Sequence, residues 1–181
     1  MDVSTCAVAG VLVFTPTPFR DERGFFSRTF DAAVAKQAGI DPAGFLQDSQ
    51  SRSHQGVIRG IHVRTGQGEA KLVRCSYGKV VDVVVDLRPS SPTFLQSASF
   101  DLSDENHRSV YIPAGIGHGW QALTEPADMC YRIDREHDPS EDLTIVFDDP
   151  ELGIDWPRPV TIMSEKDRTA PALAQVRHRL G

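Results

Sequence analysis

The sequence of 181 residues has few cysteines, no excess of basic residues and no long apolar segment. Cys6, Cys75 and Cys130 are widely spaced and form no CxxC pair, which argues against a disulfide framework or a zinc site and suits a reducing compartment. The 25 Asp and Glu residues outnumber the 19 Lys and Arg residues, so a nucleic acid polymer would find no extended basic face. The opening MDVSTCAVAGVLVF has no basic start, and Gly10 interrupts its apolar run. We therefore expect neither a signal peptide nor a membrane span, and a cytoplasmic protein.

The sequence also lacks internal repeats, low-complexity tracts and any shift in composition that would mark a linker. We therefore expect a single domain over residues 1–181. A chain of this length can bury a core without the help of disulfides or metals.

Short runs rich in Val, Ile and aromatic residues recur between Gly, Pro, Asp and Ser residues. This pattern is typical of many short strands rather than of alternating strands and helices. Asp31 is expected to cap a helix that runs through Lys36 and ends at Gly39, and Pro171 to open a last helix through Arg179. Many strands with few helices favour an all-β sandwich or barrel of the jelly-roll type. The expected strands are residues 10–14, 57–63, 71–76, 80–87, 97–102, 109–112, 119–123, 129–133 and 143–147.

The run VVDVVVDL, residues 80–87, is apolar except for Asp82 and Asp86. A strand with this composition is expected to be central and buried on both faces. Buried carboxylates need partners, so we expect both acids to face special partner groups.

His62 lies in VIRGIHVR, on an expected strand. Side chains two apart on a strand share a face, so His62 points with Gly60 and Arg64 and away from Ile61 and Val63. It can therefore face a polar cavity while its neighbours fill apolar space. Taken alone, the residue also fits a hydrogen-bonded core or surface histidine.

His118 is a second candidate, in IPAGIGHGW. Its spacing, PxGxxH, resembles the second motif of cupins, and RGIH resembles a degenerate first motif. Metal-binding cupins have a second His two residues after the first, and here that position is Arg64, whose guanidinium has no lone pair for a cation. His62, His118 and Glu69 remain as candidate ligands, so we favour an acid–base site over a metal site.

Several long blocks, in order and over almost the whole chain, resemble the dTDP-4-dehydrorhamnose 3,5-epimerase family. They are DERGFF (residues 21–26), GFLQDSQSRSHQGVIRGIHVR (44–64), KLVRCSYGKVVDVVVDLRPSSPTF (71–94), LSDENHRSVYIPAGIGHGW (102–120), DDPELGIDWP (148–157) and SEKD (164–167). The resemblance implies a cupin jelly-roll barrel with a few short helices and a homodimer with exchanged N-terminal strands. It implies no metal or redox cofactor.

The resemblance also implies the catalytic groups. The family's base matches His62, and the carboxylate that supports it matches Asp167, which we expect to hold imidazole Nδ1. The family's acid matches Tyr131, and the lysine near the sugar ketone matches Lys71. A hydrogen beside a 4-keto group is acidic because its carbanion is an enolate, so the reaction needs a base on one face, a proton donor on the other and a cation at the oxygen. Without the resemblance, Tyr131 fits a half-buried barrel aromatic and Lys71 a solvated strand end.

Further positions match the family's substrate cleft. Two arginines are expected near the nucleotide diphosphate or sugar, because a planar cationic fork suits phosphate oxygens. The chain departs from the family at Arg28, where an acidic residue is usual, at Ser49, where Asn is usual, and at His137, where Tyr is usual. These departures leave the recognised nucleotide sugar open, and also whether one or both carbons are epimerised. The expected substrate-binding residues are Arg23, Phe26, Gln47, Ser49, Arg59, His118 and His137.

We therefore expect an enzyme that epimerises a dTDP-linked 4-keto-6-deoxy sugar at C3, C5 or both. One alternative is a non-catalytic cupin that binds a sugar nucleotide, but such a protein is expected to lose His62, Tyr131 or Asp167, and all three are present. The other is a metal-dependent cupin enzyme, against which Arg64 argues.

Overall fold

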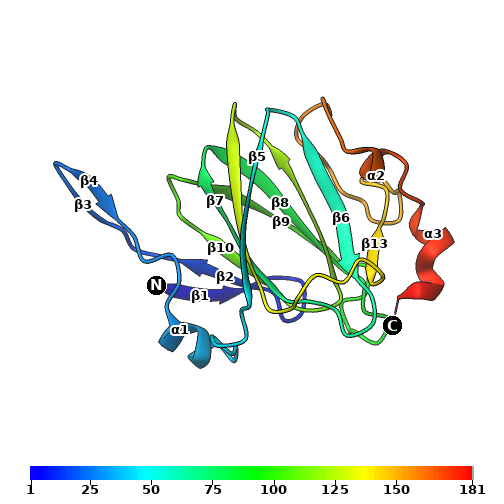
Figure 1. Cartoon of the computed structure of the whole chain (residues 1–181), viewed down its shortest axis with the longest axis horizontal. Helices are drawn as coiled ribbons and strands as arrows, with labels where there is room; N and C mark the ends of the chain where they lie inside the picture. Colours follow the sequence, from blue (N-terminus) through cyan, green and yellow to red (C-terminus); the bar gives the residue numbers. More distant parts are fainter. Residues whose placement is uncertain (181) are drawn as a thin grey trace.

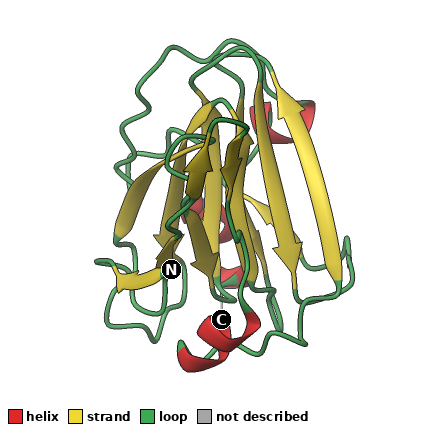
Figure 2. Ribbon diagram, turned by 90° about the vertical axis from the view of Figure 1, so that its left-hand side faces the viewer, coloured by secondary structure: helices red, strands yellow, loops and turns green. Residues whose placement is uncertain are grey.

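The computed structural model describes residues 1–180, and its strands form two antiparallel sheets packed face to face (Figures 1 and 2). The first sheet has the order β1 (Asp2–Thr5), β2 (Leu12–Thr15), β10 (Ser109–Ile112), β7 (Lys71–Tyr77), β12 (Ala127–Ile133) and β5 (Gln47–Ser53). The second has the order β13 (Asp142–Thr144), β6 (Ile58–Arg64), β11 (Ile116–Ala122), β8 (Lys79–Asp86) and β9 (Ser97–Ser103). This arrangement confirms the expected all-β jelly roll.

A hairpin of β3 (Phe19–Asp21) and β4 (Gly24–Phe26) projects away from the two sheets (Figure 1). Helix α1 (Ala32–Gln37) begins as expected at Asp31, whose carboxylate accepts from two backbone N–H groups. Near the C-terminus lie α2 (Glu165–Arg168) and α3 (Leu173–Val176), which continues as a 3-10 turn, Arg177–Arg179. Within residues 1–180, no helix is long and apolar enough to cross a membrane.

The interior strands of the second sheet are covered on both faces. One face packs against the first sheet, in a core that includes Val84, Trp120 and Met129. The other is covered by the C-terminal segment, where Val83 and Leu173 belong to a second apolar cluster. Strand β8 therefore buries every residue from 80 to 86, which confirms the expected central strand.

Several elements were not predicted from the sequence: β1, β3, β4, β5 and α2. Strand β5 has the sequence QDSQSRS and no apolar residue, so it lacks the alternation that reveals a strand. It forms because its backbone pairs with β12 at the sheet edge. The expected strand 119–123 instead spans Ile116–Ala122, since Gly117 continues the strand rather than ending a turn.

Candidate active site

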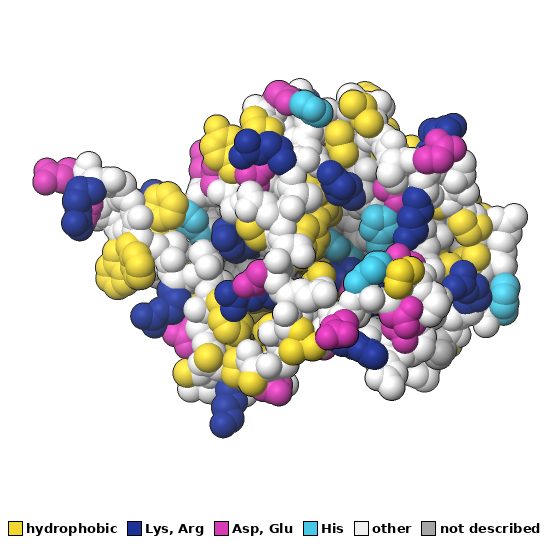
Figure 3. Space-filling view, viewed as in Figure 1, with side chains coloured by type: hydrophobic (Ala, Val, Ile, Leu, Met, Phe, Trp, Pro, Cys, Tyr) yellow, Lys and Arg dark blue, Asp and Glu magenta, His cyan; other side chains and the backbone are white. Residues whose placement is uncertain are grey.

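A cavity of about 310 Å³ lies between the two sheets. Strands β6 and β11 form one wall, and β5, β7 and β12 form the other. Figure 3 shows histidine and basic side chains gathered around a hollow in the middle of the face of the molecule that is viewed there. The cavity brings together six of the predicted site residues, Ser49, Arg59, His62, Lys71, His118 and Tyr131.

His62 reaches this cavity through the alternation of β6. Ile61 and Val63 turn into the apolar cluster beneath the C-terminal segment, while the His62 side chain remains 40% exposed. The strand can pass close to β11 because residue 60 is glycine: a Cβ there would lie 2.5 Å from Gly119 Cα, and the φ of Gly60 is +131°. His62 therefore stands directly opposite His118 in the β6–β11 pairing.

Asp167 lies behind His62, with its Oδ1 2.5 Å from His62 Nε2. Helix α2 places this carboxylate, because Ser164 caps the helix and its hydroxyl accepts from the Asp167 N–H. Burial acts to raise the pKa of Asp167, but the hydrogen bond and electrostatic interaction with His62 hold it below the usual value. The expectation that Asp167 holds Nδ1 is wrong: it contacts Nε2, which leaves Nδ1 as the ring nitrogen available for another group.

Tyr131 comes from β12 in the opposite sheet. Its hydroxyl oxygen accepts a hydrogen bond from Trp120 Nε1 at 2.8 Å and lies 3.3 Å from Ser51 Oγ. Because an indole N–H only donates, the tyrosine keeps its own proton free to donate. Burial raises the pKa of Tyr131, so the phenol is protonated at neutral pH.

Lys71 begins β7 and its side chain is 14% exposed. Its Nζ lies 2.8 Å from Glu69 Oε1, so the wall of the cavity holds a paired cation. Arg59 lines the cavity from β6, with its guanidinium 5.9 Å from the ring centre of Trp120.

His118 is buried and its Nε2 lies 2.6 Å from Asp82 Oδ1. This pair explains why an acid interrupts the apolar run of β8. Both acids of β8 were expected to have partner groups. The partner of Asp82 is His118, and Asp86 accepts hydrogen bonds from Arg88, Ser91 and Thr93. Asp82 is not among the site residues predicted from the sequence, although an acid within an apolar strand is the signal that points to it.

Other predicted residues lie apart from this cavity. Arg23 and Phe26 are on the projecting hairpin, where Arg23 pairs with Asp21 and Phe26 is 67% exposed. His137 lies in an exposed loop, with its Nδ1 2.6 Å from the Arg64 guanidinium. Gln47 starts β5 opposite Ile133.

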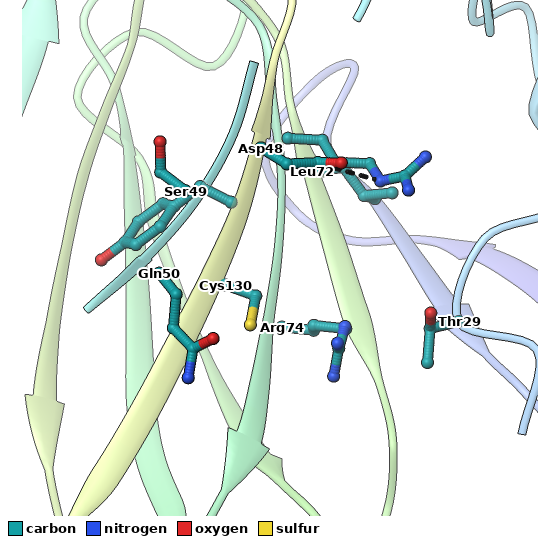
Figure 4. A pocket seen from close by; sticks show the side chains of 9 residues that line it. Thr29, Asp48, Ser49, Gln50, Leu72, Arg74 and Cys130 are labelled. Atoms are coloured by element: carbon teal, nitrogen blue, oxygen red, sulfur yellow. Dashed lines mark ion pairs between the residues drawn. The ribbon is translucent and has the colours of Figure 1, made fainter. Parts of the chain in front are cut away.

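A second hollow, of about 300 Å³, lies beside the first and is lined mainly by residues of β5, β7 and β12 (Figure 4). Ser49, Gln50 and Tyr131 line both hollows. Arg74 and Cys130 point into it, and Asp48 forms an ion pair with Arg132 at 3.2 Å. Neither His62 nor Asp167 lines this hollow. His62 lines the inner cavity, and His62 and Asp167 together line a further hollow of about 410 Å³ beside α2.

The donor set does not suit a cation. Glu69 is paired with the guanidinium of Arg64 and the amine of Lys71, and the histidines contact carboxylates of their own. Within residues 1–180, no three His, Cys, Asp or Glu side chains gather as a metal site would require. The side chains present are those of acid–base chemistry.

A histidine held by a carboxylate faces a protonated tyrosine across a cavity that also holds a lysine. These groups define an isomerase that can remove a proton from one face of a carbon atom and return one to the other. The sequence model of the dTDP-4-dehydrorhamnose 3,5-epimerase family matches residues 5–175. A dTDP-4-dehydrorhamnose 3,5-epimerase from Pseudomonas aeruginosa is 43% identical over 175 residues, which are 96% of this chain and 97% of that protein.

Two solved structures are also similar. NovW, a 4-keto-6-deoxy sugar epimerase from the novobiocin gene cluster of Streptomyces spheroides, has a TM-score of 0.94 and 38% identity, covering 98% of this chain and 90% of that one. RmlC from Legionella pneumophila, solved in complex with dTDP-4-keto-L-rhamnose, has a TM-score of 0.92 and 37% identity, covering 99% and 96%. The chain belongs to the dTDP-4-dehydrorhamnose 3,5-epimerase family. It is a nucleotide-sugar epimerase with a cupin jelly-roll fold.

Proposed function

We propose that the chain epimerises a dTDP-linked 4-keto-6-deoxyhexose at a carbon next to the keto group. One observation carries this proposal: His62, which is paired with Asp167, and Tyr131 lie on strands of opposite sheets and line one cavity. That is the arrangement which inversion at carbon requires, because the proton must leave one face and return on the other.

The first step is proton removal by His62. With Nε2 bound to Asp167, Nδ1 takes the proton, and the carboxylate stabilises the imidazolium that forms. The electron pair moves onto the 4-keto oxygen, and the ammonium of Lys71 stabilises the enolate.

The second step is proton return by Tyr131. Its hydroxyl donates to the opposite face of the enolate, and the Trp120 N–H and the Ser51 hydroxyl then stabilise the phenolate. The His62 imidazolium releases its proton to solvent, and a proton from solvent reloads the tyrosine.

The test is incubation with dTDP-4-keto-6-deoxyglucose in deuterated water, with label read at C3 and C5 separately by NMR. The parent should incorporate deuterium with inversion, and His62→Ala should lose exchange at every position by at least about a hundredfold. The exposed His178 offers a matched control, and His178→Ala should behave as the parent. Equal exchange in the parent and in His62→Ala would remove the proposed base.

We also propose that the protein acts as a homodimer, in which the hairpin of each copy completes the cavity of the other. Phe19 and Phe26 on this hairpin are 78% and 67% exposed, and such aromatic surface is typical of an interface. Figure 3 shows hydrophobic side chains at the surface of the projecting segment. In the same chain the hairpin stands away from the sheets (Figure 1), so Arg23 could serve the diphosphate only in a second copy.

Light scattering should give a dimeric mass at micromolar concentration. A sharper test mixes two inactive variants, Arg23→Ala and His62→Ala, after partial unfolding. If the hairpin crosses between copies, mixed dimers regain one intact site, whereas the double variant Arg23→Ala/His62→Ala mixed with itself stays inactive. Failure of the mixture to regain activity, together with a monomeric mass, would refute the exchange.

A further inference from the structure

Three charged side chains lie in a row that begins at Lys71, on the wall of the cavity, and continues through Glu69 to Arg64 behind it. Lys71 Nζ is 2.8 Å from Glu69 Oε1, and Glu69 Oε2 is 2.9 Å from Arg64 Nε. Their side chains are only 14%, 7% and 6% exposed. Burying charges is costly, and apolar residues would often fill such a wall with equal or greater stability. Three buried charges beside the proposed catalytic cavity therefore point to a role in the reaction.

Given the proposed function, we propose that Glu69 is a positioning residue that holds the Lys71 ammonium where the enolate oxygen forms. A lysine has four rotatable side-chain bonds, so its amine alone would sample many positions. Glu69 precedes it by two residues and restrains the amine from the side of the loop. A cation that is already in place stabilises the developing charge without reorganisation during the reaction.

Arg64 holds Glu69 in turn, and it is itself anchored on several sides. Its guanidinium donates to the Glu136 carbonyl at 2.8 Å and to His137 Nδ1 at 2.6 Å, and lies 3.6 Å from Asp142. Because a guanidinium only donates, His137 Nδ1 must carry a lone pair in this contact. Arg64 therefore ties the loop that holds His137 to the same carboxylate that restrains Lys71.

The contact between Glu69 and Arg64 is an ion pair without hydrogen-bond geometry: Glu69 Oε2 has no hydrogen-bond partner among residues 1–180. Electrostatic attraction therefore holds Glu69 against Arg64. Glu69→Gln keeps the shape of the side chain and removes that attraction, which makes it a sharp probe.

The kinetic test is a double-variant cycle of Glu69→Gln with Lys71→Met. Glu69→Gln alone should lower kcat by about ten- to a hundredfold and change KM by less than about threefold. In the Lys71→Met background the same change should alter kcat by less than about twofold, because Glu69 acts through the lysine. Equal loss of kcat in both backgrounds, or a rise in KM alone, would overturn the inference. The exposed Glu105 supplies the matched control, since Glu105→Gln should leave kcat unchanged.

A second measurement does not depend on the substrate. Crystal structures of the parent and of Glu69→Gln should show the Lys71 amine displaced by more than about 1 Å, a shift large enough to impair catalysis. An amine that stays in place refutes the positioning role, even if the epimerase activity is confirmed. An amine that moves supports it, even if the parent proves inactive on the proposed sugar, so the two proposals fail separately.

Discussion

Replacing Tyr131 with phenylalanine should separate proton removal from proton return. The change removes the hydroxyl that accepts from Trp120 and contacts Ser51, and leaves the ring in place. His62 and Asp167 are untouched, so the enolate should still form. Without the acid on the far face, the imidazolium returns a solvent-derived deuteron to the original face, which labels the substrate without inverting it.

The magnitudes follow from the same contacts. Loss of a positioned acid should lower inversion by about a hundred- to ten-thousandfold, while exchange stays within about tenfold of the parent. The Trp120 N–H is left buried without its acceptor, which should cost about 1–3 kcal/mol of stability. In a chain of this size, that cost lowers Tm by about 2–12 °C.

The assay is NMR in deuterated water, with exchange and inversion measured in the same sample. Tyr77 is half-exposed on β7 and offers a matched control, so Tyr77→Phe should match the parent in rate and nearly in Tm. If Tyr131→Phe inverts carbon as fast as the parent, another group delivers the proton, and our assignment of the acid is wrong.

Two further predictions concern carboxylates. Asp167→Asn should lower deuterium exchange and inversion together, by about a hundred- to a thousandfold. In the same NMR assay, the ratio of exchange to inversion should therefore match that of the parent, whereas in Tyr131→Phe this ratio rises. An unequal loss would mean that Asp167 does not act through His62. Burial acts to raise the pKa of Asp86, but hydrogen bonds from three side chains lower it from the ordinary 3.8 to about 2. Because this folded-state pKa is depressed, the carboxylate should stabilise the fold by about 2 kcal/mol above pH 4 and lose that contribution as pH falls through about 2. In denaturant unfolding, Asp86→Asn should have a lower free energy of unfolding than the parent at pH 7, and the two should converge near pH 2. The surface variant Asp101→Asn is the control and should lose little stability at any pH. Equal free energies of unfolding for Asp86→Asn and the parent at pH 7 would contradict the lowered pKa of Asp86.

Strand periodicity predicted a substantial part of the site. The alternation of β6 was enough to turn His62 away from Ile61 and Val63, and the structure has this arrangement. The two acids of β8 were expected to have partners because a buried carboxylate is costly without one, and both have them. The direction of a side chain and the need of a buried acid for a partner both depend on neighbours along one strand, so they can be predicted from the sequence.

The polar wall of the cavity could not be predicted in this way. Strand β5 contributes Ser49 and Ser51 to the cavity, yet it has no apolar residue to show its period. It becomes a strand because β12 offers a free edge, and that pairing spans a long separation in sequence. Helix α2 left a weak signal, a serine three residues before an acid, but four residues are too few for a helical period.

The relative placement of distant side chains was the least accessible feature. His62 and Asp167 are 105 residues apart, and the ring nitrogen that meets the carboxylate depends on how α2 packs against β6. The sequence resemblance grouped the hairpin residues Arg23 and Phe26 with the cavity residues, whereas the structure places them apart within one chain. Motif order carries no information about which copy of a chain supplies a residue.

The central claim is that acid and base act on opposite faces of one carbon. The most direct measurement is a crystal structure with a bound dTDP-6-deoxyglucose, whose 4-hydroxyl replaces the ketone and prevents reaction. We predict that a ring carbon next to C4 lies within about 4 Å of His62 Nδ1 on one face and of the Tyr131 oxygen on the other. A hexose bound with both groups on the same face, or outside the cavity between the sheets, would contradict the account.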